Sequence, residues 1–109
     1  MLDLPRSARL LVGPEFKRVF ESRQRYGNAL FRIHFVEAKQ ARLGIAVSRR
    51  VSGSAVVRNR IRRQIRESFR LRRPQLAAMD FVVLAQPAAA RQTRPQLRAA
   101  LDQLWQRFT

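Results

Sequence analysis

Arginines dominate residues 57–73, and their spacing points to the binding of a polyanion. The segment holds eight arginines against one acid, Glu67. Residues four apart lie in one row along a helix. Four of the arginines form such a row: Arg58, Arg62, Arg66 and Arg70. We expect no acid on this row, so its charges repel one another unless a polyanion binds. A guanidinium group donates paired hydrogen bonds to phosphate, and the row therefore predicts a phosphate-binding surface.

Side chains that perform catalysis are scarce in the rest of the sequence. There is no cysteine, the only histidine is His34, and the seven acids are scattered singly. One histidine without a second ligand in view predicts no metal site, and separated acids predict no two-metal nuclease centre. The sequence also lacks a glycine-rich phosphate loop. We therefore expect no catalytic residue, no bound cofactor and no metal site in this chain, and we expect any chemistry to belong to a partner.

The composition indicates a nucleic acid as that partner. The 109 residues include 23 basic and seven acidic side chains, which gives a net charge of +16, and nearly all of the basic residues are arginine. Arginine also stacks on bases, which favours a structured nucleic acid or another polyphosphate. The absence of cysteine suits a reducing compartment, no apolar run is long enough to span a membrane, and the N-terminus lacks the apolar core of a signal peptide. We therefore expect a cytoplasmic protein without a membrane partner.

The arginine-rich segment also carries its own folding signals. Apolar residues recur on one arc of a helix, the stripe that packs on a core. These residues are Val57, Ile61, Ile65 and Phe69. Ser54 is a suitable N-cap residue, and Pro74 cannot continue the helix. The pattern predicts one helix over residues 57–73, with its arginines on the surface that the core leaves free.

Three short segments predict strands. Residues 30–37 alternate between apolar and polar side chains, which is typical of a half-buried strand. Residues 43–50 form the second candidate, and its small residues leave room on one face for a packed helix or a ligand. The small residues are Gly44, Ala46 and Ser48. Residues 80–85 are almost continuously apolar, which is typical of a central strand. Residues 25–28 are expected to form a loop.

Two more helices are expected towards the ends of the chain. Pro14 and Pro95 mark their first turns, where proline is favoured. The first helix is expected to end near Ser22, and the last helix contains Trp105, which we expect in the core. Residues 1–8 predict an irregular basic arm. The order α-β-β-α-β-α predicts a single α+β domain over residues 1–109, with helices packed against one small sheet.

Phe16 and Phe20 share one face of the first expected helix, because they lie four residues apart. Two interpretations of the pair remain open. Both rings can belong to the core, as most phenylalanines do. Alternatively, aromatic rings beside a basic groove stack on unpaired bases without demanding a particular sequence.

Taken together, these motifs resemble the protein subunit of bacterial ribonuclease P. The motifs follow one another in the order of that family's pattern: Phe16 and Phe20, LGIAVSRR at residues 43–50, RNRIRR at 58–63, IRESFR at 65–70, DFVV at 80–83 and the helix around Trp105. The resemblance covers residues 9–108.

The resemblance implies a fold of order α-β-β-β-α-β-α, with one short strand more than the residues alone predict. It implies a small, mainly antiparallel sheet of about four strands packed with three helices. It also implies a left-handed crossover from strand through helix to strand, whereas the general rule predicts a right-handed one.

For function, the resemblance implies an RNA-binding subunit of an endoribonuclease that matures the 5′ end of tRNA. The RNA subunit cleaves the 5′ leader from precursor tRNA with magnesium ions, and the protein alone is inactive. The implied contacts to the catalytic RNA subunit are Arg58, Asn59, Arg60, Arg62, Arg63, Arg66 and Arg70. The implied contacts to the leader, in a cleft between the first helix, the sheet and the central helix, are Phe16, Phe20, His34, Ser48, Arg49 and Arg50. No obligate protein partner is implied.

Two features depart from the family pattern. His34 stands where the family often has an aromatic residue, and an imidazole stacks less strongly. The connection at residues 37–42 is shorter than in some relatives. A structural RNA-binding protein of the ribosomal type fits the charge and the size equally well and remains the alternative. A DNA-binding transcription factor fits less well, because the arginine-rich helix is flanked by strands instead of a tight helix-turn-helix.

Overall fold

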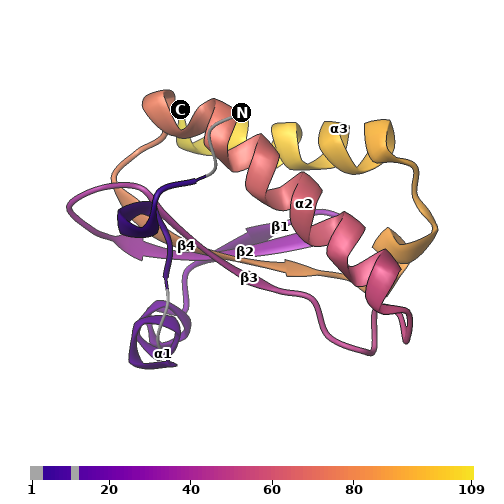
Figure 1. The fold of residues 1–109 in the computed structure, drawn as a ribbon. Coiled ribbons are helices and arrows are strands. Elements are labelled where there is room, and N and C mark those ends of the chain that lie inside the picture. The colour runs from indigo at the N-terminus through magenta and orange to yellow at the C-terminus, as the bar shows by residue number, and fades with distance from the viewer. Residues whose placement is uncertain (1–3, 11–12) are drawn as a thin grey trace.

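A four-stranded sheet separates two layers of helices (Figure 1). The computed structural model describes residues 4–10 and 13–109. The strands are β1 (Arg25–Gly27), β2 (Phe31–Glu37), β3 (Arg42–Ala46) and β4 (Met79–Ala85). The helices are α1 (Gly13–Glu21), α2 (Ala55–Arg72) and α3 (Arg94–Trp105). In Figure 1, α2 and α3 cover one face of the sheet and α1 lies against the other. The predicted α+β class and the element order α-β-β-β-α-β-α are confirmed.

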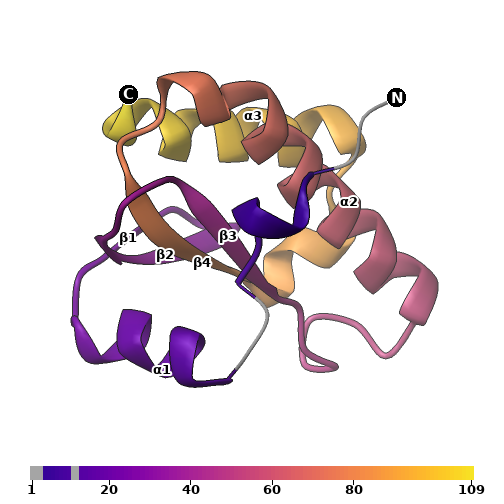
Figure 2. The ribbon, with the colours of Figure 1, turned by 60° about the vertical axis from the view of Figure 1, so that its left-hand side comes forward.

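The strand order across the sheet is β1-β2-β4-β3 (Figure 2). β4 lies inside the sheet, as predicted, where it pairs antiparallel with β2 and parallel with β3. Parallel neighbours need a crossover connection, and α2 supplies it. The crossover from β3 through α2 to β4 is left-handed, as the resemblance implied and against the general preference (Figures 1 and 2).

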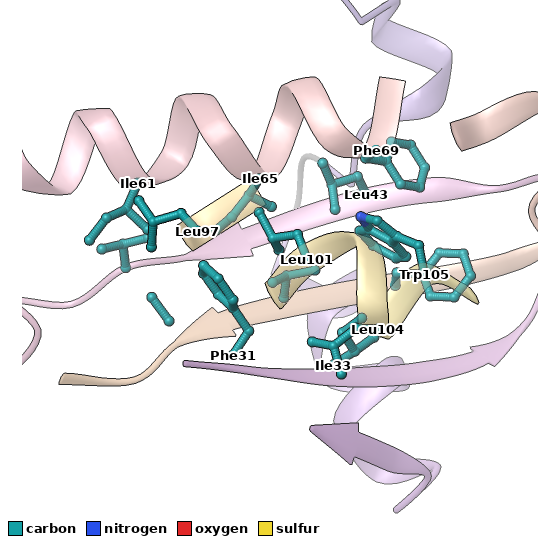
Figure 3. Close-up of a cluster of buried hydrophobic side chains, with 14 of the residues drawn as sticks. Phe31, Ile33, Leu43, Ile61, Ile65, Phe69, Leu97, Leu101, Leu104 and Trp105 are labelled. Atoms are coloured by element: carbon teal, nitrogen blue, oxygen red, sulfur yellow. The ribbon is translucent and has the colours of Figure 1, made fainter. Parts of the chain in front are cut away.

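The main core lies between the sheet and the layer of α2 and α3 (Figure 3). The predicted stripe of α2 supplies Ile61, Ile65 and Phe69, all fully buried. Trp105 is also fully buried, so its prediction as a core residue is confirmed. Its indole Nε1 donates a hydrogen bond of 3.0 Å to Ser68 Oγ on α2, which satisfies the one polar group of the ring. This bond and the surrounding apolar contacts fix the two helices together above the sheet.

The ends of α2 follow from local chemistry. The Ser54 hydroxyl accepts a hydrogen bond from the backbone N–H of Val57, which is the predicted N-cap. The helix begins at Ala55, two residues before the predicted start. At the other end the chain continues as a short 3₁₀ turn, Arg73–Gln75, which contains Pro74. Proline therefore ends the α-helix where the sequence predicted.

Two strand predictions were wrong in detail. Residues 25–27, expected in a loop, form β1, in which Tyr26 pairs with Ile33 of β2. A strand of three residues is too short to show an alternating pattern in the sequence. Residues 25–27 are extended because they pair with β2. The strand expected over residues 43–50 ends at Ala46. Beyond it, the Val51 N–H donates to the Ser48 carbonyl at 3.1 Å and closes a turn. Since β4 ends at Ala85, only one residue beyond the partner of Ala46, a longer β3 would have no strand to pair with.

Leu4 begins the described part of the N-terminal segment. Leu4 and Ala8 are buried in the main core, and Arg6–Ala8 form a 3₁₀ turn. Leu10 N–H donates to the Leu43 carbonyl at 2.9 Å, which attaches the segment to β3. The remainder of the basic arm expected over residues 1–8 lies outside the described residues.

Candidate nucleic-acid interface

The face of the sheet opposite α2 and α3 is only partly covered, because α1 is its single helix (Figure 1). Val19 of α1 packs with Leu10 and Val82 in a small second core. Phe16 is half-buried at the margin of this cluster, and Phe20 remains 39% exposed. The two phenylalanines therefore differ: Phe16 belongs partly to the core, whereas Phe20 presents its ring to solvent.

The predicted site residue His34 meets Phe20 on this face. The rings of Phe20 and His34 lie with centroids 4.8 Å apart in an edge-to-face arrangement. His34 pairs with Val82, and Val82 pairs with Gly44, so these residues form one row across the sheet. The row leads from the Phe20–His34 pair to Gly44, one of the small residues of β3. Val82 and Gly44 are buried against α1, so the accessible part of this row is its end at the Phe20–His34 pair.

Gly44 is the position where the small residues of β3 matter most. A Cβ added at Gly44 would lie 2.7 Å from Phe16 Cζ, closer than real Cβ contacts come. The absence of a side chain thus allows Phe16 to lie directly on the strand. A cavity of about 150 Å³ opens beside this contact. Its lining consists of Leu4, Arg9, Leu10, Phe16, Leu43, Gly44, Ile45 and Arg66. Phe16 and Arg66, predicted for different RNA contacts, are therefore brought to one cavity.

The imidazole of His34 lies in a half-buried and electropositive setting. Burial lowers the pKa of His34 below 6.5, and the nearby charges of Arg32 and Arg25 lower it further. Its Nδ1 is buried and has no hydrogen-bond partner among the described residues. A neutral imidazole beside the Phe20 ring is an uncharged aromatic surface at neutral pH.

The predicted residues Ser48, Arg49 and Arg50 are all exposed, but they lie beyond the end of β3. The sequence placed them on the strand, and the structure places them in the turn that follows it. No hydrogen bond described for residues 4–10 and 13–109 joins them to Phe16, Phe20 or His34. Their guanidinium groups extend the basic surface at one end of the sheet.

Two arginines of the predicted α2 row bind the linker that precedes the helix. Arg58 Nη1 donates to the Ser52 carbonyl at 3.0 Å. Arg62 Nη2 donates to the Val47 carbonyl at 3.2 Å, and its Nη1 donates to Asn59 Oδ1 at 2.9 Å. These contacts turn the first half of the row towards β3. They also give both arginines a structural role that the sequence did not indicate.

The expectation of an unneutralised row was wrong at its last member. Arg70 forms an ion pair with Glu67, one turn earlier on α2. The acid lies three residues before Arg70, within reach on the helix surface. The free positive charge of the row is therefore concentrated on Arg58, Arg62 and Arg66.

The remaining predicted residues of α2 point towards α3. Arg60 Nη2 donates to the Ala90 carbonyl at 3.2 Å, and Arg63 is exposed. Together with Asn59, they line a pocket between the first half of α2 and the start of α3. The arginine-rich helix thus presents two basic surfaces, one towards β3 and one towards α3.

Sequence reasoning missed a polar network beneath α1. Asp80 is 1% exposed and accepts hydrogen bonds from Arg42, while Arg42 also donates to Glu15 at 2.8 Å. Arg18 reaches the same carboxylate at 3.4 Å. The available signal was an acid at the start of an otherwise apolar central strand, since a buried carboxylate needs a cation. The network attaches α1 to the sheet.

No group of three or more histidine, cysteine or acidic residues within the described ranges is arranged to hold a metal ion. None of the described helices is both long and apolar enough to cross a membrane. The fold and this surface, a basic α+β domain with the exposed Phe20 ring and the guanidinium groups of α2, define an RNA-binding protein.

Comparison with known proteins names the family. The sequence matches the Ribonuclease P family over residues 4–109. The ribonuclease P protein component of Xanthomonas campestris is 41% identical over 104 residues, 94% of this chain and 70% of the relative. That of Escherichia coli O157:H7 is 41% identical over 108 residues, 97% of this chain and 91% of the relative. The chain belongs to the family of ribonuclease P protein components.

Solved structures agree with this assignment. The ribonuclease P protein of Staphylococcus aureus superposes with a TM-score of 0.85 at 30% identity, over 91% of this chain and 93% of that protein. The Thermotoga maritima protein gives a TM-score of 0.81 at 28% identity, over 93% and 97% of the two chains. The ribosomal-type alternative is therefore not favoured.

Proposed function

We propose that this chain acts within a ribonuclease P holoenzyme whose RNA subunit performs the cleavage that removes the 5′ leader of precursor tRNA. The family assignment supports participation in the holoenzyme. The protein contributes affinity and positioning, and by itself it does not cleave.

The leader binds, in this proposal, along the partly covered face of the sheet. The observation that carries this proposal is the contact between the exposed ring of Phe20 and the imidazole of His34. Rings that face solvent stack on unpaired bases irrespective of sequence, as a variable leader requires. Phe16 extends this aromatic surface to the cavity that contains Arg66. Ser48, Arg49 and Arg50 supply polar and cationic groups at the end of β3.

The RNA subunit binds the basic surfaces of α2. Arg58, Asn59, Arg60, Arg62, Arg63, Arg66 and Arg70 are the proposed contacts. Arg63 is the clearest of them, because its side chain is exposed and forms no described contact. Arg70 contributes least, because Glu67 neutralises it. Each guanidinium group that meets a phosphate adds a charge-assisted hydrogen bond.

In this proposal, the magnesium ions are bound by the RNA subunit. Among the described residues, no group of three or more histidine, cysteine or acidic side chains could hold a metal ion. The protein needs no obligate protein partner, and the expected compartment is the cytoplasm, where precursor tRNA is processed.

Reconstitution tests the proposal. The purified chain is titrated into a ribonuclease P RNA transcript at a low magnesium concentration, and cleavage of a precursor tRNA is followed. We expect leader removal at the mature 5′ end only when both subunits are present. Cleavage by the protein alone would assign catalysis to the chain, and no stimulation of the RNA would contradict the proposed subunit role. RNA crosslinked to the chain in cells identifies the partner independently, since a ribosomal protein would recover ribosomal RNA.

A further inference from the structure

A second basic pocket lies on the side of α2 that faces α3, away from the aromatic face of the sheet. Its volume is about 410 Å³. Its lining consists of Val56, Asn59, Arg60, Arg63, Gln64 and Arg94. Arg94 is the first residue of α3, and the family motif on α2 gave no reason to single it out.

The lining of this pocket contains cations and amides but no acid. The acids nearest along the helices are engaged elsewhere: Glu67 pairs with Arg70, and Asp102 lies 3.8 Å from Arg72. Arg63 and Arg94 are exposed, with no hydrogen-bond or ion-pair partner among the described residues. The pocket therefore concentrates positive charge that nothing in the described chain neutralises.

The walls of the pocket are held in place by bonds between elements. Arg60 Nη2 donates to the Ala90 carbonyl at 3.2 Å, which ties α2 to the turn before α3. Arg98 Nη2 donates to Gln64 Oε1 at 3.1 Å, which ties α3 to α2. Thr93 and Gln96 form a capping box that fixes the start of α3 and hence the backbone of Arg94. The free guanidinium groups of Arg63 and Arg94 thus project from a rigid frame.

We propose that this pocket is a two-helix binding site for phosphodiester groups of a folded RNA, and that Arg94 is one of its contact residues. Donors without acceptors match phosphate oxygens, and guanidinium groups on two helices can contact successive phosphates. Val56, 78% exposed at the rim, offers an apolar surface to a sugar edge. No aromatic ring lines the pocket, so the pocket is suited to the sugar-phosphate backbone of a folded RNA and not to stacking on unpaired bases.

This inference rests on the proposed function, because it assigns the pocket to the RNA subunit and not to the leader. The leader is single-stranded and is proposed to lie along Phe20 and His34, on the opposite face of the sheet from α3 (Figure 1). A ligand in the pocket is separated from that face by α2 and the sheet. We therefore assign the pocket to the folded RNA subunit.

The test compares Arg94→Ala with Arg91→Ala. Both arginines are exposed and close in sequence, and both substitutions remove one positive charge, but Arg91 does not line the pocket. Affinity for the ribonuclease P RNA transcript is measured at several salt concentrations. Arg94→Ala should weaken binding about tenfold, the loss expected for one charge-assisted contact. It should also reduce the slope of log K against log salt by about 0.7–0.9. Arg91→Ala should do neither.

Two further readouts locate the effect. At saturating protein, the Arg94→Ala holoenzyme should retain the wild-type preference for precursor over mature tRNA. A photocrosslinker at position 94 should label the RNA subunit and not the leader. Equal losses in the two alanine variants, or a crosslink to the leader, would overturn the pocket assignment.

The wild-type chain separates failure of this inference from failure of the proposed function. If the wild-type protein does not bind the RNA subunit, the proposed function fails. If the wild-type protein binds and Arg94→Ala binds equally well with the same salt slope, only the assignment of the pocket fails. Urea denaturation of both variants, expected to match the wild type, excludes a folding defect as the cause.

Discussion

Asp80 and Arg42 form two parallel hydrogen bonds, from Nε to Oδ1 at 2.7 Å and from Nη2 to Oδ2 at 2.8 Å. The hydrogen bond with Asp80 raises the pKa of Arg42 and keeps its guanidinium group charged. Arg42 also donates to Glu15, and Arg18 donates to the Glu37 carbonyl at 2.8 Å. One buried carboxylate thus joins β3 and β4 to α1, the helix that carries Phe16 and Phe20.

Asp80→Ala should lower the free energy of unfolding by about 3 kcal/mol, the lower end of the range for breaking a buried ion pair, because Arg42 retains some access to water. Arg18→Ala should cost less than about 1 kcal/mol, since half of that side chain is exposed and its contact is long. Urea denaturation measures both. Equal losses in the two variants would contradict the central role of the Asp80–Arg42 pair.

Phe20→Ala should weaken the binding of precursor tRNA by about 1–3 kcal/mol, because one stacking ring is lost. Binding of mature tRNA, which has no leader, should not change. The ring is 39% exposed, so its loss should have little effect on stability. Binding of both tRNAs to the reconstituted holoenzyme is the measurement, and thermal melting is the control. A uniform loss for both tRNAs together with a lower Tm would identify Phe20 as a core residue.

Gly44→Ala should displace the Phe16 ring, because the new Cβ would lie 2.7 Å from Cζ and 3.0 Å from Cε2. We expect a loss of about 1–3 kcal/mol in stability from overpacking and a smaller preference for precursor over mature tRNA. Gly53→Ala is the matched control, since nothing lies within 4 Å of its added Cβ. Unchanged tRNA preference in Gly44→Ala would show that the position of Phe16 is irrelevant to the leader.

His34 should titrate below pH 6.5, because burial and the charges of Arg32 and Arg25 disfavour its protonated form. The unfolded chain then takes up the proton at a higher pH than the folded chain. The contribution of His34 to stability is therefore fully present above pH 6.5 and falls as the pH drops towards the folded pKa.

NMR titration of the imidazole measures this pKa directly. Addition of a single-stranded leader oligonucleotide should raise it, because RNA phosphates offset the two arginine charges. His34→Gln should abolish the stability change over the same pH window. Two results would contradict the assigned environment: a His34 pKa of 6.5 or higher in the free protein, or a His34 pKa that does not change when the oligonucleotide is added.

Arg63→Ala and Arg60→Ala should separate RNA binding from stability. Arg63 is exposed, so its loss should weaken RNA-subunit binding by about 1.5–3 kcal/mol and leave the fold unchanged. Arg60 also donates to the Ala90 carbonyl. Its loss should therefore weaken RNA-subunit binding and also lower the free energy of unfolding by about 0.5–1.5 kcal/mol. Cleavage across a protein titration should recover at saturation in both variants. Normal assembly without cleavage at saturation would assign a direct chemical role to the arginine.

The sequence alone determined the elements whose signals are local. The apolar stripe at Ile61, Ile65 and Phe69, the Ser54 cap and the stop at Pro74 define α2, because helix periodicity and capping depend on near neighbours. The continuous apolar run of β4 is also a local signal, and it predicted a strand that is buried on both faces and therefore central. The arginine motif on α2 also carried the family resemblance.

Only the tertiary structure decided which of these residues meet. β1 exists because β2 pairs with it, and β3 ends at Ala46 because β4 ends beside it. The Phe20–His34 contact and the Asp80–Arg42 pair join residues from separate elements, and the pocket of Arg94 needs α2 and α3 in their observed positions. Such relationships depend on contacts between residues far apart in the chain, which neither helical nor strand periodicity encodes.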